Sequence, residues 1–145
     1  SHLSDGGFYD VIHLSKKPIV ASHSNARALS PHPRNLTDDM IRKIAEVGGV
    51  AGVNFYGAFL QPDAKSEKST IEALAAHIMY MNNLGGEDFI ALGTDFDGIS
   101  GEMEINSPLY MEKLFTELKR KGMSERKIEK LAYKNVVRVL YEVLG

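Results

Sequence analysis

Short apolar runs alternate with helical patterns along this chain, and that alternation constrains its fold more than any other feature. The predicted strands cover residues 1–3 (the tail of a strand), 19–21, 50–55 and 89–93. The predicted helices cover residues 5–14, 38–47, 70–84, 108–121 and 124 onward. Strands that alternate with helices indicate parallel βαβ units, and short apolar strands are typical of a sheet that is buried on both faces.

The helix boundaries are marked by capping residues. Thr37 is a predicted N-cap, and Ser107 precedes a proline at the first helical position. Gly122 is suited to the left-handed residue that follows a helix. Ser124 begins a final helical region, for which we predict a break near Asn135.

The number of units limits the size of the fold. A complete (β/α)₈ barrel typically takes about 250 residues, whereas this chain has 145 residues. We therefore predict an α/β fold in which residues 1–145 form a single segment of parallel βα units, about half of a TIM-type (β/α)₈ barrel.

Composition excludes several classes of protein. The net charge of −2 provides no basic excess for nucleic acid, and no apolar run approaches the roughly 18 residues of a membrane span. The chain has no Cys, which excludes a disulfide scaffold, a thiolate zinc site and a cysteine nucleophile. We expect a cytoplasmic protein without nucleic-acid or membrane partners.

Polar side chains follow the predicted strands at the point where each strand ends. His2, His23, Asn54 and Asp95 each lie at or just beyond a strand, and Arg34 lies in the loop after the second strand. In parallel α/β folds, functional groups gather at the carboxyl ends of the strands. We therefore expect these residues to face one cleft.

The histidines have two interpretations. His2 and His23, on successive strand ends, could bind one metal ion, because neighbouring strands lie about 4.8 Å apart; the alternative is two hydrogen-bonded loop histidines. Two ligands do not complete a tetrahedral zinc site. We interpret His13 and His77 as packing or surface residues, with a supporting role at the site open for His77, and His32 as either a loop residue or a substrate contact.

Arg34 and Asp95 are candidate groups for substrate and proton chemistry. Pro33 restricts the backbone beside Arg34, whose guanidinium either binds a carboxylate in bidentate fashion or is an ordinary surface group. Asp95 is a candidate general acid/base at a strand end, whereas Asp97 is predicted to cap the following turn. An EF-hand fails because Ile99 stands at the fifth loop position. A magnesium-dependent phosphatase of the haloacid dehalogenase type stays as an alternative, although no Asp follows Asp97.

Four sequence blocks occur in the order and spacing of a known family. They are residues 1–4 (SHLS), 17–27 (KPIVASHSNAR), 31–35 (PHPRN) and 93–98 (GTDFDG). Together they resemble the membrane dipeptidase (renal dipeptidase) family of zinc peptidases, over essentially the whole chain. The resemblance implies the C-terminal half of a (β/α)₈ barrel with two Zn²⁺ ions at its mouth, in a metallopeptidase that hydrolyses dipeptides.

The resemblance also implies a role for each candidate residue. His2 and His23 match the two histidines that bind one zinc ion, Arg34 matches the arginine that binds the terminal carboxylate of the dipeptide, and Asp95 matches the aspartate that moves protons. The family's other metal ligands belong to an N-terminal half that has no counterpart in this sequence. The chain alone is therefore expected to be inactive and to need that half or a homo-oligomer, and an inactive assembly module remains an alternative.

Overall fold

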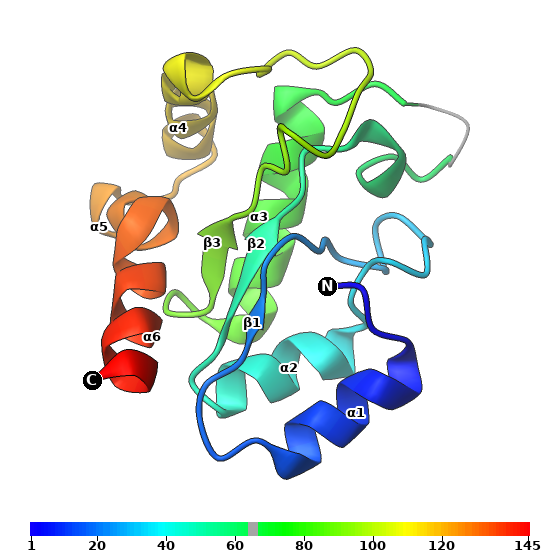
Figure 1. Ribbon diagram of the computed structural model, residues 1–145. Helices are drawn as coiled ribbons and strands as arrows, with labels where there is room; N and C mark the ends of the chain where they lie inside the picture. Colours follow the sequence, from blue (N-terminus) through cyan, green and yellow to red (C-terminus); the bar gives the residue numbers. More distant parts are fainter. Residues whose placement is uncertain (64–66) are drawn as a thin grey trace.

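The computed structural model describes residues 1–63 and 67–145, and its centre is a parallel sheet (Figure 1). The strands β1 (Val20–Ala21), β2 (Val50–Val53) and β3 (Ile90–Leu92) lie in the order β1-β2-β3. The helices are α1 (Asp5–Leu14), α2 (Asp38–Glu46), α3 (Ile71–Gly85), α4 (Met111–Arg120), α5 (Glu125–Glu129) and α6 (Asn135–Leu144). Two 3₁₀ turns, η1 (Gly57–Phe59) and η2 (Pro108–Tyr110), and a π-helical turn, η3 (Lys130–Lys134), complete the regular structure.

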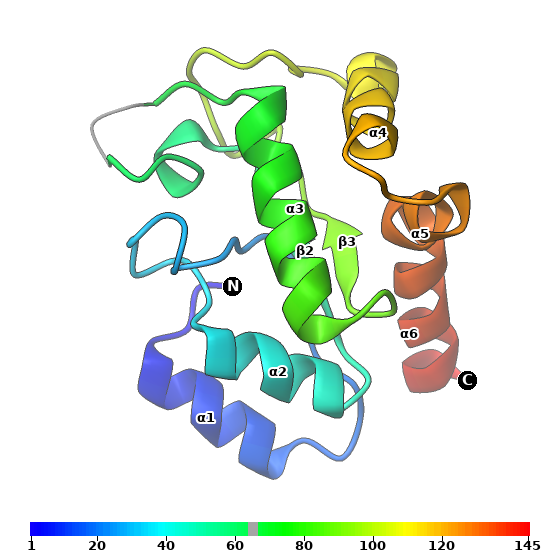
Figure 2. The same cartoon turned by 180° about the vertical axis from the view of Figure 1, so that it is seen from behind.

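The core lies between the sheet and the helices that connect its strands. Figure 2 shows α3 in front of the strands, with α2 below it. Ile41 and Ile44 of α2, and Leu74 and Ile78 of α3, are fully buried. All four residues of β2 are buried as well, as predicted for a strand at the centre of a covered parallel sheet.

Most of the predicted helix boundaries are confirmed. Thr37 caps α2, because its side chain accepts a hydrogen bond from the N–H of Met40. Gly122 ends the helical segment of α4 with a φ of 93°, and the N–H of Met123 donates to Leu118. The break predicted near Asn135 does not occur: residues 125–144 stay helical, and only the hydrogen-bonding pattern changes there, from the π-helical turn η3 to α6.

One predicted strand is absent, and one predicted helix begins with a different kind of turn. Residues 1–3 form no strand, and the part of the chain that the structure describes has three strands instead of four. The side-chain oxygen of Ser1 takes the place of a strand carbonyl, because it accepts the N–H of His23 (2.9 Å). Ser107 is an N-cap followed by Pro108, as predicted, because its hydroxyl accepts the N–H of Leu109 (3.3 Å). The first turn is the 3₁₀ turn η2, however, and the α-helix starts only at Met111.

Two glycines allow the sheet to bend closely on itself. A Cβ atom on Gly52 would lie 2.3 Å from the carbonyl oxygen of Ser22, and one on Gly93 would lie 1.9 Å from the same atom. Both distances are far shorter than a non-bonded contact, so only glycine fits at these positions. The close approach brings the ends of β1 and β3 together where the candidate residues lie.

Helix length and polarity also bear on the prediction about membranes. Within residues 1–63 and 67–145, none of the helices is both long enough and apolar enough to cross a bilayer.

Candidate functional site

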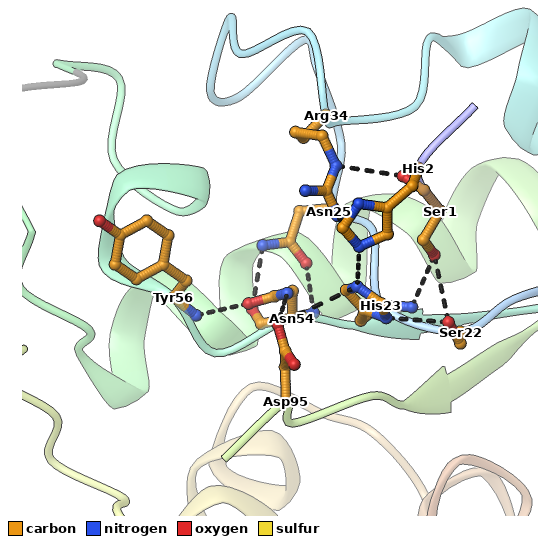
Figure 3. A network of polar contacts seen from close by, with 9 residues as sticks. All are labelled: Ser1, His2, Ser22, His23, Asn25, Arg34, Asn54, Tyr56 and Asp95. Atoms are coloured by element: carbon orange, nitrogen blue, oxygen red, sulfur yellow. Dashed lines mark hydrogen bonds and ion pairs between the residues drawn. The ribbon is translucent and has the colours of Figure 1, made fainter. Parts of the chain in front are cut away.

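The predicted site residues gather around one open hollow at the carboxyl end of the sheet. The hollow measures about 480 Å³. It is lined by His2, His23, Arg34, Tyr56, Phe59, Asp95, Gly98, Ile99 and Ser100. All four residues predicted to carry the chemistry therefore share one cavity, although they come from four separate segments of the chain (Figure 3).

The two histidines meet through their Nε2 atoms. His2 Nε2 and His23 Nε2 lie 3.0 Å apart, while His23 Nδ1 contacts the hydroxyl of Ser22 (2.8 Å). Two nitrogens on one tetrahedral zinc, with Zn–N bonds of 2.0–2.1 Å, lie about 3.3 Å apart. The pair therefore fits two of the positions around one metal ion.

The remaining donors of such a metal site are not found in this part of the chain. Among residues 1–63 and 67–145, no group of three or more His, Cys, Asp or Glu side chains is placed to hold a metal ion. Asp95 Oδ2 lies 4.0 Å from His23 Nε2, and Arg34 Nη2 donates to His2 Nε2 (3.0 Å). A metal ion would need the lone pair that Arg34 contacts, so metal binding requires Arg34 to release His2.

The surroundings of His23 favour its neutral form. Burial lowers the pKa of His23, the charge of Asp95 opposes that shift, and the charges of Arg34 and His2 lower the pKa further. A neutral imidazole is the form that binds a metal ion.

Arg34 is held through Nε, through Nη2 and on one face of its guanidinium. Its Nε donates to the carbonyl of Ser1 (3.1 Å), and its guanidinium carbon lies 5.4 Å from the centre of the Phe59 ring. Its backbone N–H donates to Nδ1 of His32 (3.2 Å), whose ring lies 4.5 Å from the Phe59 ring. Within the described residues Nη1 makes no hydrogen bond, so part of the guanidinium fork is available to a carboxylate.

Asp95 adopts an unusual backbone conformation. Its φ of 60° lies in the left-handed region, which Asp tolerates better than most residues. Asn54 Nδ2 donates to Asp95 Oδ2 (3.1 Å), and the N–H of Gly98 donates to the Asp95 carbonyl (2.8 Å). Asp97 is exposed and makes no hydrogen bond in the described part of the chain, so it does not cap this turn as predicted.

His13 and His77 lie away from the hollow. His13 is exposed on α1, where its Nδ1 contacts the carbonyl of Tyr9 (2.7 Å). His77 is buried on α3, accepts the N–H of Ala26 at Nδ1 (3.1 Å) and reaches the carbonyl of Leu60 through Nε2 (3.1 Å). Burial lowers the pKa of His77 to about 4. His77 is therefore a packing residue, as one of the sequence interpretations had it.

Sequence reasoning missed two aromatic residues that line the hollow and two asparagines that are buried behind it. Tyr56 and Phe59 line the hollow, and they follow the strand-end residue Asn54 closely enough that the same strand-end rule could have included them. Asn25 and Asn35 lie in two of the quoted blocks but carry no sequence signal of burial.

Comparisons with known sequences agree with the four blocks. The family described as membrane dipeptidase (peptidase family M19) matches residues 1–144. An uncharacterized protein in the pqqA 5′ region of Klebsiella pneumoniae is 42% identical, over 99% of this chain and 53% of its own length. Dipeptidase ataJ of Aspergillus terreus is 33% identical, over 99% of this chain and 35% of its own length. The chain thus spans about half, or less, of the curated relatives it matches.

Solved structures match the fold equally closely. A metallopeptidase from Rhodobacter sphaeroides, liganded with a phosphinate mimic of the dipeptide L-Ala-D-Ala, superposes with a TM-score of 0.92 and 35% identity, over 98% of this chain and 41% of that chain. Dipeptidase AC, an M19 metallopeptidase, superposes with a TM-score of 0.91 and 36% identity, over 98% of this chain and 42% of that chain. The predicted α/β fold, about half of a barrel, is confirmed. The chain belongs to the membrane dipeptidase family, peptidase family M19.

Proposed function

We propose that the protein containing this chain is a zinc-dependent dipeptidase, and that residues 1–145 are the C-terminal half of its barrel domain. The observation that carries this proposal is the convergence of His2 and His23 beside Arg34 and Asp95, in one hollow of a chain that belongs to a dipeptidase family. The substrate class is a dipeptide with a free C-terminal carboxylate.

Each residue of the hollow has a role in this proposal. His2 and His23 would hold one of two Zn²⁺ ions, and the missing half of the domain would supply the other ligands. Bound zinc supplies Lewis acidity, which polarises a peptide carbonyl and lowers the pKa of water toward 7. Arg34 binds the terminal carboxylate of the substrate through its free N–H groups. That anchor favours a dipeptide over a longer chain, because the carboxylate must lie one residue from the scissile bond.

Asp95 handles the proton. Its Oδ2 accepts a hydrogen bond from Asn54, which keeps the carboxylate in one orientation. In that orientation the carboxylate can accept a proton from the water that attacks the peptide carbonyl. It can then donate that proton to the nitrogen of the leaving amine. The leaving amine then departs in a neutral form.

A second candidate function is an assembly module that is inactive until it joins a complementary chain. Two observations favour it. The chain matches only 53% and 35% of the length of the two relatives named above, and it brings together only two histidines as metal donors. The magnesium-dependent phosphatase has no support from the family match.

The intact gene product and residues 1–145 alone should be assayed in parallel. We expect the intact, zinc-loaded protein to hydrolyse L-Ala-D-Ala or another free dipeptide, to lose activity on chelation and to regain it with zinc. We expect residues 1–145 alone to be inactive. An intact, zinc-loaded protein that cleaves no dipeptide would contradict the proposed activity, whereas turnover by residues 1–145 alone would contradict the proposed half-site.

A further inference from the structure

Three asparagines lie buried behind the site. Asn25 follows His23 by two residues, Asn35 follows Arg34 directly, and Asn54 follows the last residue of β2. Their exposed fractions are 0%, 1% and 0%. Burying an amide costs free energy unless its polar atoms are hydrogen-bonded, so the partners of these three side chains indicate what they are for.

Asn25 and Asn35 tie the loop after β1 to the loop after β2. Asn25 Oδ1 accepts the N–H of Asn54 (2.8 Å), and Asn25 Nδ2 donates to the carbonyls of Asn54 (3.0 Å) and Phe59 (3.2 Å). Asn35 Nδ2 also donates to the carbonyl of Phe59 (2.9 Å), and Asn35 Oδ1 accepts the N–H of Asn25 (3.3 Å). The backbone of Asn54 is therefore fixed by buried amide contacts.

The side-chain amide of Asn54 can be placed in one orientation only. Its Oδ1 accepts the N–H of Tyr56 (2.7 Å), and only an oxygen can accept there. Its Nδ2 must then lie on the other side, where it donates to Asp95 Oδ2 (3.1 Å), as Figure 3 shows.

Asp95 depends on that bond for its orientation. Its left-handed backbone is costly for a residue with a side chain, and 27% of its side chain is exposed. In the described part of the chain, the bond from Asn54 is the one hydrogen bond that the carboxylate of Asp95 accepts. The other partner there is His23, whose Nε2 lies 4.0 Å from the same oxygen, too far for a hydrogen bond.

We propose that Asn54 is a positioning residue, whose buried amide holds the Asp95 carboxylate facing His23 while Asn25, itself bonded to Asn35, holds the backbone of Asn54. This inference rests on the proposed role of Asp95. Asn54 would act on the rate of the chemical step and not on substrate binding, because Arg34, the proposed carboxylate anchor, makes no contact with it.

Two variants of the intact gene product test this role. Asn54→Asp keeps the oxygen that faces Tyr56 and replaces the donor to Asp95 by a second carboxylate. Asn54→Ser adds no charge, and its shorter side chain withdraws the donor group from Asp95. Residues that orient metal ligands typically contribute about 10–100-fold to metal affinity or activity, and we take the same range for the partner of Asp95. We expect each variant to lower kcat for L-Ala-D-Ala by that factor, with KM within about twofold of the parent value and with unchanged zinc content.

A control variant separates positioning from general damage. Asn82→Asp places a carboxylate at another buried asparagine, on α3, whose Oδ1 has no partner in the described residues. It should lower the melting temperature while keeping kcat. If Asn54→Asp does not fold, Asn54→Ser alone carries the comparison with this control.

Combination with Asp95→Asn completes the test. If Asn54 acts through Asp95, the double variant should lose no more kcat than Asp95→Asn alone, whereas additive losses would show a merely structural role and overturn the proposal. The proposal would also be overturned if the Asn54 variants kept a normal kcat while Asp95→Asn lowered it. Normal kcat in Asp95→Asn would instead overturn the proposed role of Asp95, and the positioning role with it.

Discussion

Arg34 is anchored by its neighbours in a way that matches a carboxylate-binding role. Ser1 and Phe59 fix one side of the guanidinium, while Nη1 makes no hydrogen bond in the described residues. Arg34→Lys in the intact enzyme keeps the charge and loses the planar fork. We expect KM to rise more for free dipeptides than for dipeptides amidated at the C-terminus. Equal losses for both substrates would show that Arg34 does not bind the carboxylate.

Asp95 and Asp97 form a matched pair, two residues apart. General acid–base groups contribute about 10²–10⁴-fold, so Asp95→Asn should lower kcat by roughly that factor with zinc content unchanged. Asp97 is exposed and unbonded in the described chain, so Asp97→Asn should change the free energy of unfolding by less than about 0.5 kcal/mol. Steady-state kinetics, zinc analysis and thermal melts test both variants. A dead Asp97→Asn enzyme beside an active Asp95→Asn enzyme would reverse the assignment.

Sequence reasoning located the residues of the hollow, but not their supports. His23 and Asp95 were found because a polar side chain that follows an apolar strand lies at a known edge of the sheet. Asn25 and Asn35 were not found, because their burial arises from contacts between two loops that are distant in sequence. The left-handed φ of Asp95 was missed as well, since Asp, unlike Gly, gives no local signal of it.

At the scale of elements, α3 carries a titratable group that ties two loops to the core. His77 accepts the N–H of Ala26 at Nδ1, so its proton is on Nε2, where it donates to Leu60. A proton on Nδ1 would place that N–H against the N–H of Ala26. Burial also disfavours the charged form, and it lowers the pKa of His77 from 6.5 to about 4.

This shift predicts a stability that depends on pH. Because the pKa is lower in the folded state, the stabilisation by neutral His77 is complete above about pH 6.5 and is lost as pH falls toward 4. The free energy of unfolding of the intact protein should fall by about 3 kcal/mol from this group between pH 7 and pH 4. Denaturant titrations at several pH values in that range give the free energy of unfolding at each pH. For His77→Gln this free energy should depend less steeply on pH than it does for the parent protein. His13→Gln, an exposed change on α1, is the control, and equal slopes for both variants would contradict the assignment.

The sheet itself offers a second prediction at this scale. A Cβ atom on Gly93 would collide with the Ser22 carbonyl, which is backbone and cannot rotate away. We expect Gly93→Ala to lower the free energy of unfolding by about 1–3 kcal/mol. Gly6→Ala on α1 is the control, because a Cβ there meets no atom within 4 Å, and it should be neutral or stabilising by up to about 1 kcal/mol. Equal melting temperatures for the two variants would show that the sheet can relax.

Elements were predicted best where capping residues mark them. Thr37 and Gly122 gave correct ends, because their preferences arise from local hydrogen bonding. The π-helical turn at Lys130–Lys134 and the absence of a strand at residues 1–3 could not be predicted. Both depend on neighbours in space: the side chain of Asn135, just after the turn, donates to the Ile90 carbonyl of β3 (2.8 Å).

At the scale of the whole molecule, a sheet of three strands with open edges follows from the half-barrel fold. In the described residues, β1 and β3 each pair on one side only. Large apolar side chains are exposed as well, with Val20 in β1 at 53% and Leu140 in α6 at 50%. The sequence predicted the half barrel because units can be counted from periodicity. It could not predict which surfaces stay open, because that depends on what packs against them.

The exposed face of α6 carries several of these apolar side chains. Exposed apolar residues recur at helical spacing, at position 133 in η3 and at positions 137, 140, 141 and 144 in α6, and are 40–79% exposed. Residues at spacings of three and four lie on one side of a helix, so they form a continuous stripe. An exposed apolar stripe and the unpaired edges of a sheet are each a site for association.

Residues 1–145 produced alone should therefore self-associate. We expect size-exclusion chromatography with light scattering to give a mass above the 16.0 kDa of the monomer, rising with protein concentration. Leu140→Glu combined with Leu144→Lys places charge in the stripe and should shift the distribution toward monomer. Leu109→Lys is the matched control: Leu109 is 87% exposed on η2, outside α6, so its replacement should leave the distribution unchanged. A monodisperse monomer at all concentrations would show that the open edges and the stripe are compatible with an isolated half barrel.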